Sequence, residues 1–345
     1  PVAVAEAATA PGYTFSGWSQ KEDFTMPAEN VTITGSFTAN GDTAYTVEHY
    51  KQNLTGDGFT LAETEELTGK TDTIATANPK TYTGFAFDES VEDTVASGNI
   101  AGDGSLVLKL YYTRDSYKVT YQYTGKVPTG ASELPAETTE KYGAAVTVAA
   151  DATAPGYTFS GWSRNDFTMP AENVTITGSF TANSNTEYTV RHHFQNILDD
   201  AYDADTAMLS ETLSGTTDTL TAAAAKTVAG FTAQSFQQKN IAGDGSTVID
   251  IYYNRNSYTV TYAVTGTVDP NPNYKQADYR FGQNVAAEAA AAKAGYDFIG
   301  WANEPAVMPA NDVTATGYFV ARTDTAYQVQ HYKQNLEDDG FTLAE

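Results

Sequence analysis

The chain of 345 residues repeats two unlike patterns in strict alternation. The first pattern is GYTFSGW at residues 12–18 and 156–162, and GYDFIGW at 295–301. The second pattern is AYTVEHYKQN at 44–53, EYTVRHHFQN at 187–196, and AYQVQHYKQN at 326–335. Two blocks in a constant order indicate a tandem array of modules rather than one globular enzyme.

The spacing of the repeats sets the size of the modules. The tryptophans Trp18, Trp162 and Trp301 are 144 and 139 residues apart, and the histidines His49, His192 and His331 are 143 and 139 apart. A period of about 140 residues leaves about 70 for each of two modules, which is enough for a small independent core.

We call the two segment types Trp modules and His modules. Trp modules occupy residues 1–40 (partial), 116–183 and 257–322, and His modules occupy 41–115, 184–256 and 323–345 (partial). The first segment lacks an opening strand, and the last echoes residues 45–63 and then stops. We therefore expect this sequence to be a window of a longer array.

Both module types predict β-strands. In the Trp module, residues 117–123 and 174–180 alternate apolar and polar side chains, and in the His module Leu106, Leu108, Leu110 and Tyr112 alternate with Val107, Lys109 and Tyr111. The 23 tyrosines and 16 phenylalanines also favour strands. The Asp103-Gly104 and Asp244-Gly245 pairs precede the last His-module strand and predict tight hairpin turns.

Short helical turns are also expected, which makes the fold class mainly β with an α+β character. The alanine-rich residues 285–294 predict a short helix that begins after Asn284 and ends at Gly295. The matching residues 146–155 predict one or two helical turns. The joints at 112–117 and 181–186 contain no long Gly/Ser or Pro-rich tether. Neighbouring modules should therefore keep restricted angles and form a semi-rigid, elongated rod.

The charge and composition exclude several classes of partner. The net charge of −24, from 43 acidic and 19 basic residues, repels nucleic-acid phosphates and anionic membrane surfaces. There is no cysteine, so disulfides and thiolate metal sites are excluded, as suits an exported bacterial protein. No apolar run is about 18 residues long, and no signal peptide is present, so any export signal or anchor is expected outside this stretch.

At this point the motifs resemble known families. Gly-Tyr-x-Phe-x-Gly-Trp followed by Met-Pro-Ala-x-Asn-Val-Thr-x-x-Gly-x-Phe resembles the internalin B-repeat, or Listeria–Bacteroides repeat, family. Tyr-x-Val-x-His-Tyr, Gly-x-Thr-Asp-Thr and the final Leu-Tyr-Tyr strand resemble mucin-binding-protein-type repeats. Both resemblances imply β-grasp-like modules in tandem on secreted or wall-anchored bacterial proteins, without a fixed catalytic apparatus. The third Trp copy departs from the pattern at residues 302–305.

Metal binding is the first candidate chemistry. His49, His192 and His331 occupy equivalent positions, and His193 adds a neighbour, but no spaced histidine pair occurs and adjacent strand residues point to opposite faces. A structural histidine is therefore favoured over a zinc ligand. The acidic segments 198–205 and 337–340 lack a complete calcium loop with its final glutamate, so solvated turns are favoured there.

Three other candidates have plainer explanations. An autocatalytic isopeptide crosslink is suggested by the equivalent lysines Lys80 and Lys226 and the equivalent asparagines Asn99 and Asn240. The sequence gives no third, acidic partner, so solvated side chains are favoured. The glycine-rich residues 98–104 lead into a strand and carry an acid, which favours a hairpin over a phosphate loop.

The tryptophans Trp18, Trp162 and Trp301 could stack on carbohydrate, but an aromatic step repeated in every module favours a core role. No nucleophile, triad or cofactor motif is found, so we expect neither catalysis nor a cofactor. We expect a stalk of a bacterial adhesin, on the surface of a Gram-positive cell wall, that projects a distal binding region. The alternatives are multivalent modules for mucin glycans or host proteins, and subunits of a self-assembling fibre.

Overall fold

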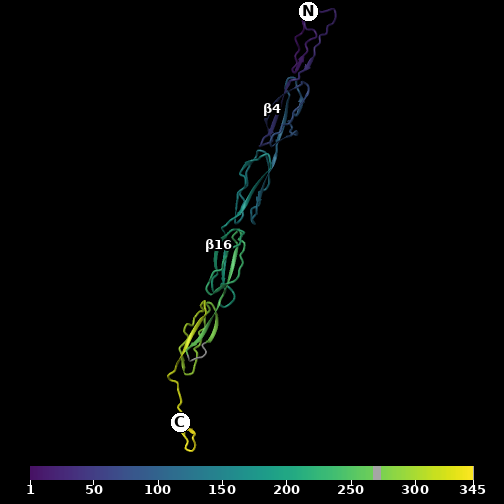
Figure 1. Ribbon diagram of the computed structural model, residues 1–345. Helices are drawn as coiled ribbons and strands as arrows, with labels where there is room; N and C mark the ends of the chain where they lie inside the picture. Colours follow the sequence, from purple (N-terminus) through teal and green to yellow (C-terminus); the bar gives the residue numbers. More distant parts are fainter. Residues whose placement is uncertain (267–272, 345) are drawn as a thin grey trace. The chain divides into compact units, whose positions relative to one another are not determined.

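The computed structural model describes residues 1–266 and 273–344, and every regular element in this part of the chain is a β-strand (Figure 1). The chain divides into two compact units. The first contains Pro1–Ala154 and Thr158–Thr181, and the second contains Pro155–Tyr157 and Ala182–Glu345. Each unit is described by itself.

One sheet topology recurs in all four complete modules. In the His module 41–115, the sheet order is β4 (Phe59–Gly69), β3 (Thr43–Gln52), β8 (Val107–Arg114) and β6 (Phe85–Phe87). The two central strands β3 and β8 are parallel, and each edge strand is antiparallel to its neighbour. The parallel pair requires a crossover connection, which residues 70–106 supply.

The other three sheets repeat this order. The Trp module 116–183 has β10 (Thr138–Lys141), β9 (Ser116–Thr124), β14 (Val174–Ala182) and β12 (Tyr157–Phe159). The His module 184–256 has β16 (Leu209–Gly215), β15 (Thr186–Phe194), β18 (Val248–Arg255) and β17 (Phe231–Ala233). The Trp module 257–322 has β20 (Asn273–Arg280), β19 (Ser257–Thr265), β22 (Val313–Ala321) and β21 (Tyr296–Phe298). Two unlike sequence patterns thus build the same sheet.

Two-stranded sheets complete the structure. They pair β5 (Ile74–Thr76) with β7 (Ser97–Asn99), and β11 (Ala145–Val146) with β13 (Phe167–Thr168). The partial modules hold one pair each: β1 (Tyr13–Phe15) with β2 (Phe37–Ala39), and β23 (Tyr332–Gln334) with β24 (Phe341–Leu343).

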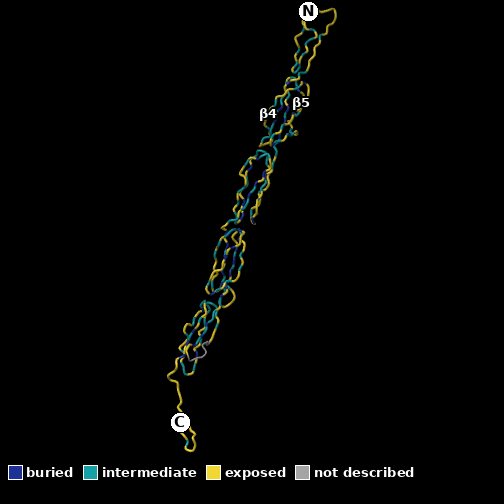
Figure 2. Tube along the Cα trace, viewed as in Figure 1, coloured by how far each residue is buried: buried dark blue, intermediate teal, exposed yellow. Residues whose placement is uncertain are grey.

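Each complete module has its own small core. In the His module 41–115, alternate residues Leu108, Leu110 and Tyr112 of β8 are fully buried against Val47 of β3. This is the period of two that the sequence predicts for the strand. Figure 2 shows the buried residues as short stretches inside the modules, with exposed residues around them.

The expected helical turns at 146–155 and 285–294 are wrong. Residues 285–294 run without regular structure, because hydrogen bonds to the neighbouring segment hold the backbone. Val285 N donates to Ala306 O at 3.0 Å, and Trp301 Nε1 donates to Ala289 O at 3.1 Å. Trp162 Nε1 makes the same bond to Ala150 O at 3.0 Å. These tertiary bonds override the helix propensity of alanine. The fold is all-β, and the likeness to a β-grasp stays a prediction.

The expected hairpin at Asp103-Gly104 is also wrong, although the tight turn exists. Gly104 has φ of 76° and its N–H donates to Ala101 O at 2.9 Å. The strands on either side, β7 and β8, belong to different sheets and do not pair. The tight turn therefore lies within a wider loop, whose two sides are joined by the antiparallel bridge between Val95 and Lys109, and does not close a two-residue hairpin.

Candidate functional site: the joints between modules

The first kind of joint lies where the Trp module 1–40 meets the His module 41–115, inside the first unit. The hydroxyl of Thr71 donates to Gly12 O at 2.9 Å, and Asn40 N donates to the same oxygen at 2.8 Å. Thr71 N donates to Asn40 O at 2.9 Å. Thr71 is only 1% exposed, and its hydroxyl also lies 2.6 Å from that of Thr43. The two modules therefore share a buried hydrogen-bond network.

Two glycines let the backbones meet at this joint. A Cβ on Gly102 would lie 2.1 Å from Pro11 O, and one on Gly12 would lie 2.4 Å from Gly102 Cα. Gly12 also has φ of 76°, in the left-handed region. The loop at 98–104 has only a weak sequence likeness to a phosphate loop. In the structure it is the surface that contacts the preceding module.

An exposed pair borders the same joint. The hydroxyl of Tyr13 donates to the carboxylate of Asp72, and this bond raises the pKa of Tyr13. Asp72 itself has φ of 64°, a conformation that aspartate tolerates better than most residues. Both residues belong to repeated motifs, the Gly-Tyr-x-Phe and Gly-x-Thr-Asp-Thr segments.

The second unit repeats these contacts between residues 155–157 and the His module 184–256. Thr217 Oγ1 donates to Gly156 O at 2.8 Å, and Thr217 N donates to Asn183 O at 3.0 Å. A Cβ on Gly243 would lie 2.0 Å from Pro155 O. Tyr157 donates to Asp218, whose φ is again 64°. The same residues at equivalent positions thus make the same contacts twice.

The second kind of joint connects a His module to the Trp module that follows it, and is centred on an arginine. In the first unit, Arg114 Nη1 donates to Tyr142 O and Arg114 Nε donates to Gln52 O, both at 2.8 Å. The Arg114 guanidinium lies 4.8 Å from the centre of the Phe85 ring. Arg114 therefore ties the end of β3 to the next module by two fixed donors.

In the second unit the corresponding arginine is more deeply buried. Arg255 is 7% exposed, and donates to Gln195 O at 2.9 Å and to Phe281 O at 2.8 Å. Its Nη2 has no hydrogen-bond partner among the described residues, and burial lowers the pKa of Arg255. A Cβ on Gly230 would lie 2.2 Å from Phe281 Cγ, as one on Gly84 would from Tyr142 Cγ.

An additional contact strengthens this joint in the second unit. Arg280 of β20 reaches back to the loop 196–205 of the His module. Its Nη1 donates to Asp199 O at 2.6 Å, and its Nη2 lies 2.7 Å from Asp200 Oδ1. The loop is longer than its counterpart at 53–58 in the first His module.

The sequence-nominated histidines lie in different environments. His49 and His192 are fully buried, with Nδ1 3.0 Å from Tyr112 Oη and 2.8 Å from Tyr253 Oη respectively. His331 is exposed. The structure brings none of these three together. In the described part of the chain, no group of three or more histidine or acidic side chains is placed to hold a metal ion.

His193 lies between two carboxylates on the other face of β15. Its Nδ1 is 2.6 Å from Asp203 Oδ2, and its Nε2 is 2.9 Å from Asp250 Oδ1. Burial lowers the pKa of His193, but the hydrogen bonds to Asp203 and Asp250 outweigh burial, so that its pKa is raised. His193 thus fastens the loop 196–205 to the sheet.

The lysines of the crosslink hypothesis pair with glutamates. Lys80 Nζ lies 2.6 Å from Glu63 Oε1 and also contacts Glu65, and Lys226 Nζ lies 2.9 Å from Glu211 Oε2. Asn99 lies in β7, paired with Ile74. The acidic segment 198–205 is used in the joint and at His193, as described above.

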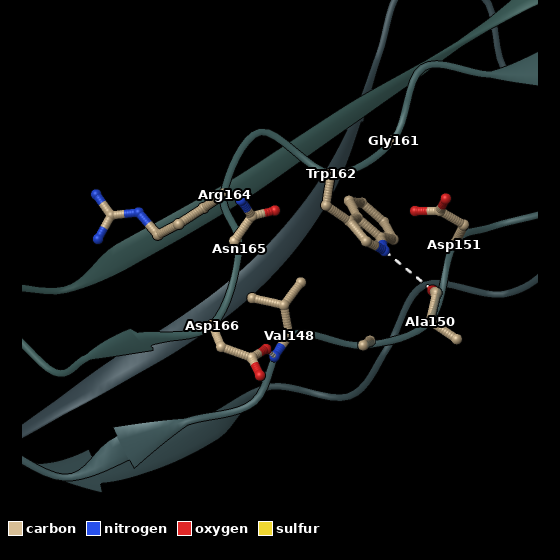
Figure 3. Close-up of a pocket in the computed structure, with 9 residues that line it drawn as sticks. Val148, Ala150, Asp151, Gly161, Trp162, Arg164, Asn165 and Asp166 are labelled. Carbon is tan, nitrogen blue, oxygen red and sulfur yellow. Dashed lines mark hydrogen bonds between the residues drawn. The ribbon is translucent and has the colours of Figure 1, made fainter.

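Trp162 combines a core position with an open groove (Figure 3). Its ring packs edge-on against Tyr121 and Phe159, with centroids 4.9 Å apart in both pairs. Its other side lines a groove of about 610 Å³, where Asp151 and Asn165 flank the indole. The tryptophan is therefore half-buried, and supports its module while it borders solvent.

The divergent copy at Trp301 keeps its loop in place by another means. Glu304 Oε1 accepts hydrogen bonds from Tyr262 Oη and from Glu288 N, both at 2.7 Å. In the Trp module 116–183, Tyr121 Oη itself accepts from Ala149 N at 2.9 Å. The substituted residues 302–305 thus insert a carboxylate between a tyrosine and a backbone donor.

Sequence reasoning missed the joint residues Gly12, Thr71, Gly102 and Arg114, although a signal was present. Each has a counterpart in the later repeats, at Gly156, Thr217, Gly243 and Arg255. Their recurrence at positions outside the strand cores could have indicated a role between modules.

Comparisons with known proteins agree with this repeated organisation. Residues 2–41 and 117–184 match the divergent InlB B-repeat domain, and residues 258–324 match the Listeria-Bacteroides repeat domain. The resemblance of the Trp modules is thereby confirmed, whereas that of the His modules to mucin-binding repeats stays a prediction. No curated protein sequence matches the chain.

Two examples represent the solved structures that are similar to this chain. SHIRT domains 3-4 from a streptococcal cell surface protein are 19% identical, with 39% of this chain and 96% of that chain covered, at a TM-score of 0.17. The Bacillus anthracis TIE protein is 8% identical, with 93% and 74% covered, at a TM-score of 0.28.

The chain therefore contains tandem repeat domains that are typical of bacterial cell-surface proteins, and the domains detected are not catalytic. Within the described residues, no helix has the length and apolar character needed to cross a membrane.

Proposed function

We propose that this array of InlB B-repeat and Listeria–Bacteroides repeat domains, with the His modules between them, is a spacer of a bacterial surface protein. The observation that carries the proposal is the recurrence of interlocked joints. Each joint contains a buried or half-buried side chain that hydrogen-bonds the backbone of the neighbouring module, Thr71 or Thr217 in one kind and Arg114 or Arg255 in the other.

The mechanism is mechanical. A spacer must resist bending at its joints, and a flexible linker would let neighbouring modules fold back on one another. Glycine pairs such as Gly12 and Gly102 let two backbones meet in direct contact, with no side chain between them. The negative charge would keep the array soluble and limit its self-association. We place the protein on the outside of the cell, and on a Gram-positive wall in particular.

Distance measurements between two spin labels test the proposal. The chain has no cysteine, so Glu66→Cys in β4 and Thr139→Cys in β10 introduce a clean pair across the Arg114 joint. If the array is a spacer, we expect the distance distribution across the joint to be as narrow as that of the control pair Glu66→Cys and Glu89→Cys, which lies within one module. A broad distribution across the joint would contradict the spacer.

One observation favours a second function, contact with glycans by the Trp modules. The groove beside Trp162 offers an indole with polar neighbours, an arrangement that suits a sugar ring and its hydroxyls. Glycan-array binding that is lost in Asp151→Ala, with unchanged stability, would support this function. If the whole chain binds no glycan, the spacer remains the one proposed function.

A further inference from the structure

A cavity of about 340 Å³ lies on the His module 41–115, away from the joints and from Trp162. Its aromatic lining consists of Tyr50, Phe59 and Tyr111, and its acidic lining consists of Asp57, Glu92 and Asp93. The aromatic residues come from the sheet and the acidic residues from two loops. The cavity therefore combines an apolar floor with a negative rim.

The floor is a packed group of rings. Tyr50 and Tyr111, register partners on β3 and β8, stack with centroids 4.9 Å apart and 16° between their planes. Phe59 meets Tyr111 edge-on at 5.0 Å. Such a platform attracts cations, because the face of an aromatic ring carries partial negative charge.

One hydroxyl at this floor is free to accept a hydrogen bond. Tyr111 is only 7% exposed, yet its hydroxyl makes no hydrogen bond to any residue that the structure describes. Burial, followed by the nearby carboxylates of Asp93 and Glu48, raises the pKa of Tyr111. Tyr111 lines the cavity, and its hydroxyl is not one of the fully buried polar atoms that lack a partner, so this oxygen can accept a hydrogen bond from a ligand N–H that enters the cavity.

The rim is likewise unpaired. Asp57, Glu92 and Asp93 form no ion pair with the described residues, and Glu48 accepts a bond at 2.6 Å from Tyr50 Oη. Several carboxylates around one opening repel one another, and a bound cation would neutralise them. The surplus of 43 acidic over 19 basic residues strengthens the local attraction.

The second His module has a different side chain at the position equivalent to this cavity. There His193 takes the place of Tyr50 and stacks on Tyr252 at 4.7 Å, while Asp203 and Asp250 contact its two nitrogens. A nitrogen-bearing ring with carboxylates on both sides thus lies over the equivalent tyrosine. The segment with Glu92 and Asp93 is absent from this module, since 15 residues lie between Gly84 and Ile100 but 10 lie between Gly230 and Ile241.

We propose that the cavity of the first His module binds a basic side chain, arginine or lysine, of a protein partner. The aliphatic stem and cationic head would lie on the rings, and the N–H groups would donate to Tyr111 Oη and to the rim carboxylates. A guanidinium suits this site best, because it stacks on aromatic rings and bridges carboxylates. The spacer does not depend on this site, so each can fail without the other.

The test is a titration of the whole chain with N-acetyl-arginine amide and N-acetyl-lysine amide, followed by NMR of the backbone amides at 57–59, 91–93 and 111. N-acetyl-citrulline amide is the neutral control, since it keeps the shape of arginine without the charge. We expect saturable shifts at these amides with the two cations and none with citrulline amide. Equal shifts with citrulline amide, or no saturable shift with arginine amide, would overturn the proposal.

Variants locate the site. Tyr111→Phe removes only the unpartnered hydroxyl, and Asp93→Asn removes one charge from the rim. We expect each to weaken the binding of arginine amide by about tenfold, as for the loss of one charged hydrogen bond. Tyr252→Phe, the matched change in the second His module, should leave binding unchanged. If Tyr111→Phe binds as the wild type does, or Tyr252→Phe weakens binding equally, the site is not this cavity.

Discussion

At the scale of residues, the joints that follow a Trp module depend on side chains that are small or absent. Gly12 and Gly102 allow backbone contact, and Thr71 is short enough to reach Gly12 O from a buried position. A longer side chain at any of these positions would separate the modules. Backbone atoms cannot move aside as a flexible side chain can. Such a change would therefore destabilise the joint itself.

The substitution Gly102→Ala tests this directly. Its Cβ would lie 2.1 Å from Pro11 O, so we expect the free energy of unfolding of the first unit to fall by about 1–3 kcal/mol. Urea unfolding measures this change, and faster hydrogen exchange at Thr71 N would place it at the joint. Gly41→Ala is the control, since nothing lies within 4 Å of its Cβ. Equal effects of the two substitutions would contradict a steric joint.

His193 makes the second His module sensitive to pH. Its folded-state pKa is raised above the unfolded value of about 6.5, so the protonated form is favoured by folding. Its stabilising contribution is therefore complete below the unfolded pKa and is lost as the pH rises through the folded pKa. We expect His193→Gln to lose stability at pH 6 but little at pH 9, measured by urea unfolding against the wild type.

The exposed His331 supplies the comparison, because His331→Gln should match the wild type at both pH values. A loss of stability in His193→Gln that is the same at pH 6 and pH 9 would show that the imidazole acts by packing alone.

At the scale of elements, strands were predictable from local pattern, and connections were not. The alternation in residues 106–112 is local, so the burial of Leu108, Leu110 and Tyr112 follows from sequence. The shape of residues 285–294 depends on Trp301 and Ala306, which are distant in the chain, and helix propensity gives the wrong answer there. The joints have the same limitation, because their partners belong to different modules.

Glu304 illustrates how one connection is held. Glu304→Ala would leave Tyr262 Oη and Glu288 N without their acceptor, and Tyr262 is 1% exposed. We expect the free energy of unfolding of the second unit to fall by about 1–3 kcal/mol in urea. Glu304→Gln keeps an acceptor oxygen and should cost less. A Glu304→Ala protein as stable as the wild type would mean that this carboxylate does not hold the loop.

At the scale of the whole molecule, stability should behave as a sum of modules and of the joints between them. Each complete module has its own core, so it does not need its neighbours to bury its apolar face. The joints add coupling between neighbours, as in other repeat arrays. A longer array would gain cooperativity from each joint without any change in the modules.

Arg255→Lys separates these two contributions in the second unit. Lysine cannot donate to Gln195 O and Phe281 O as the guanidinium does, so about 2–3 kcal/mol of coupling should be lost. Hydrogen exchange should accelerate at Phe281 N, which donates across the joint to Asn256 O, and at Asn256 N, which donates beside the joint to Gly230 O, while the amides of β15 and β19 stay protected. The exposed Arg322→Lys, whose partner is Asp297, should change stability by less than about 0.5 kcal/mol. A joint that only couples two modules can open without unfolding either of them. If exchange in the Arg255→Lys protein were faster throughout the sheets of both modules, the two modules would share one core.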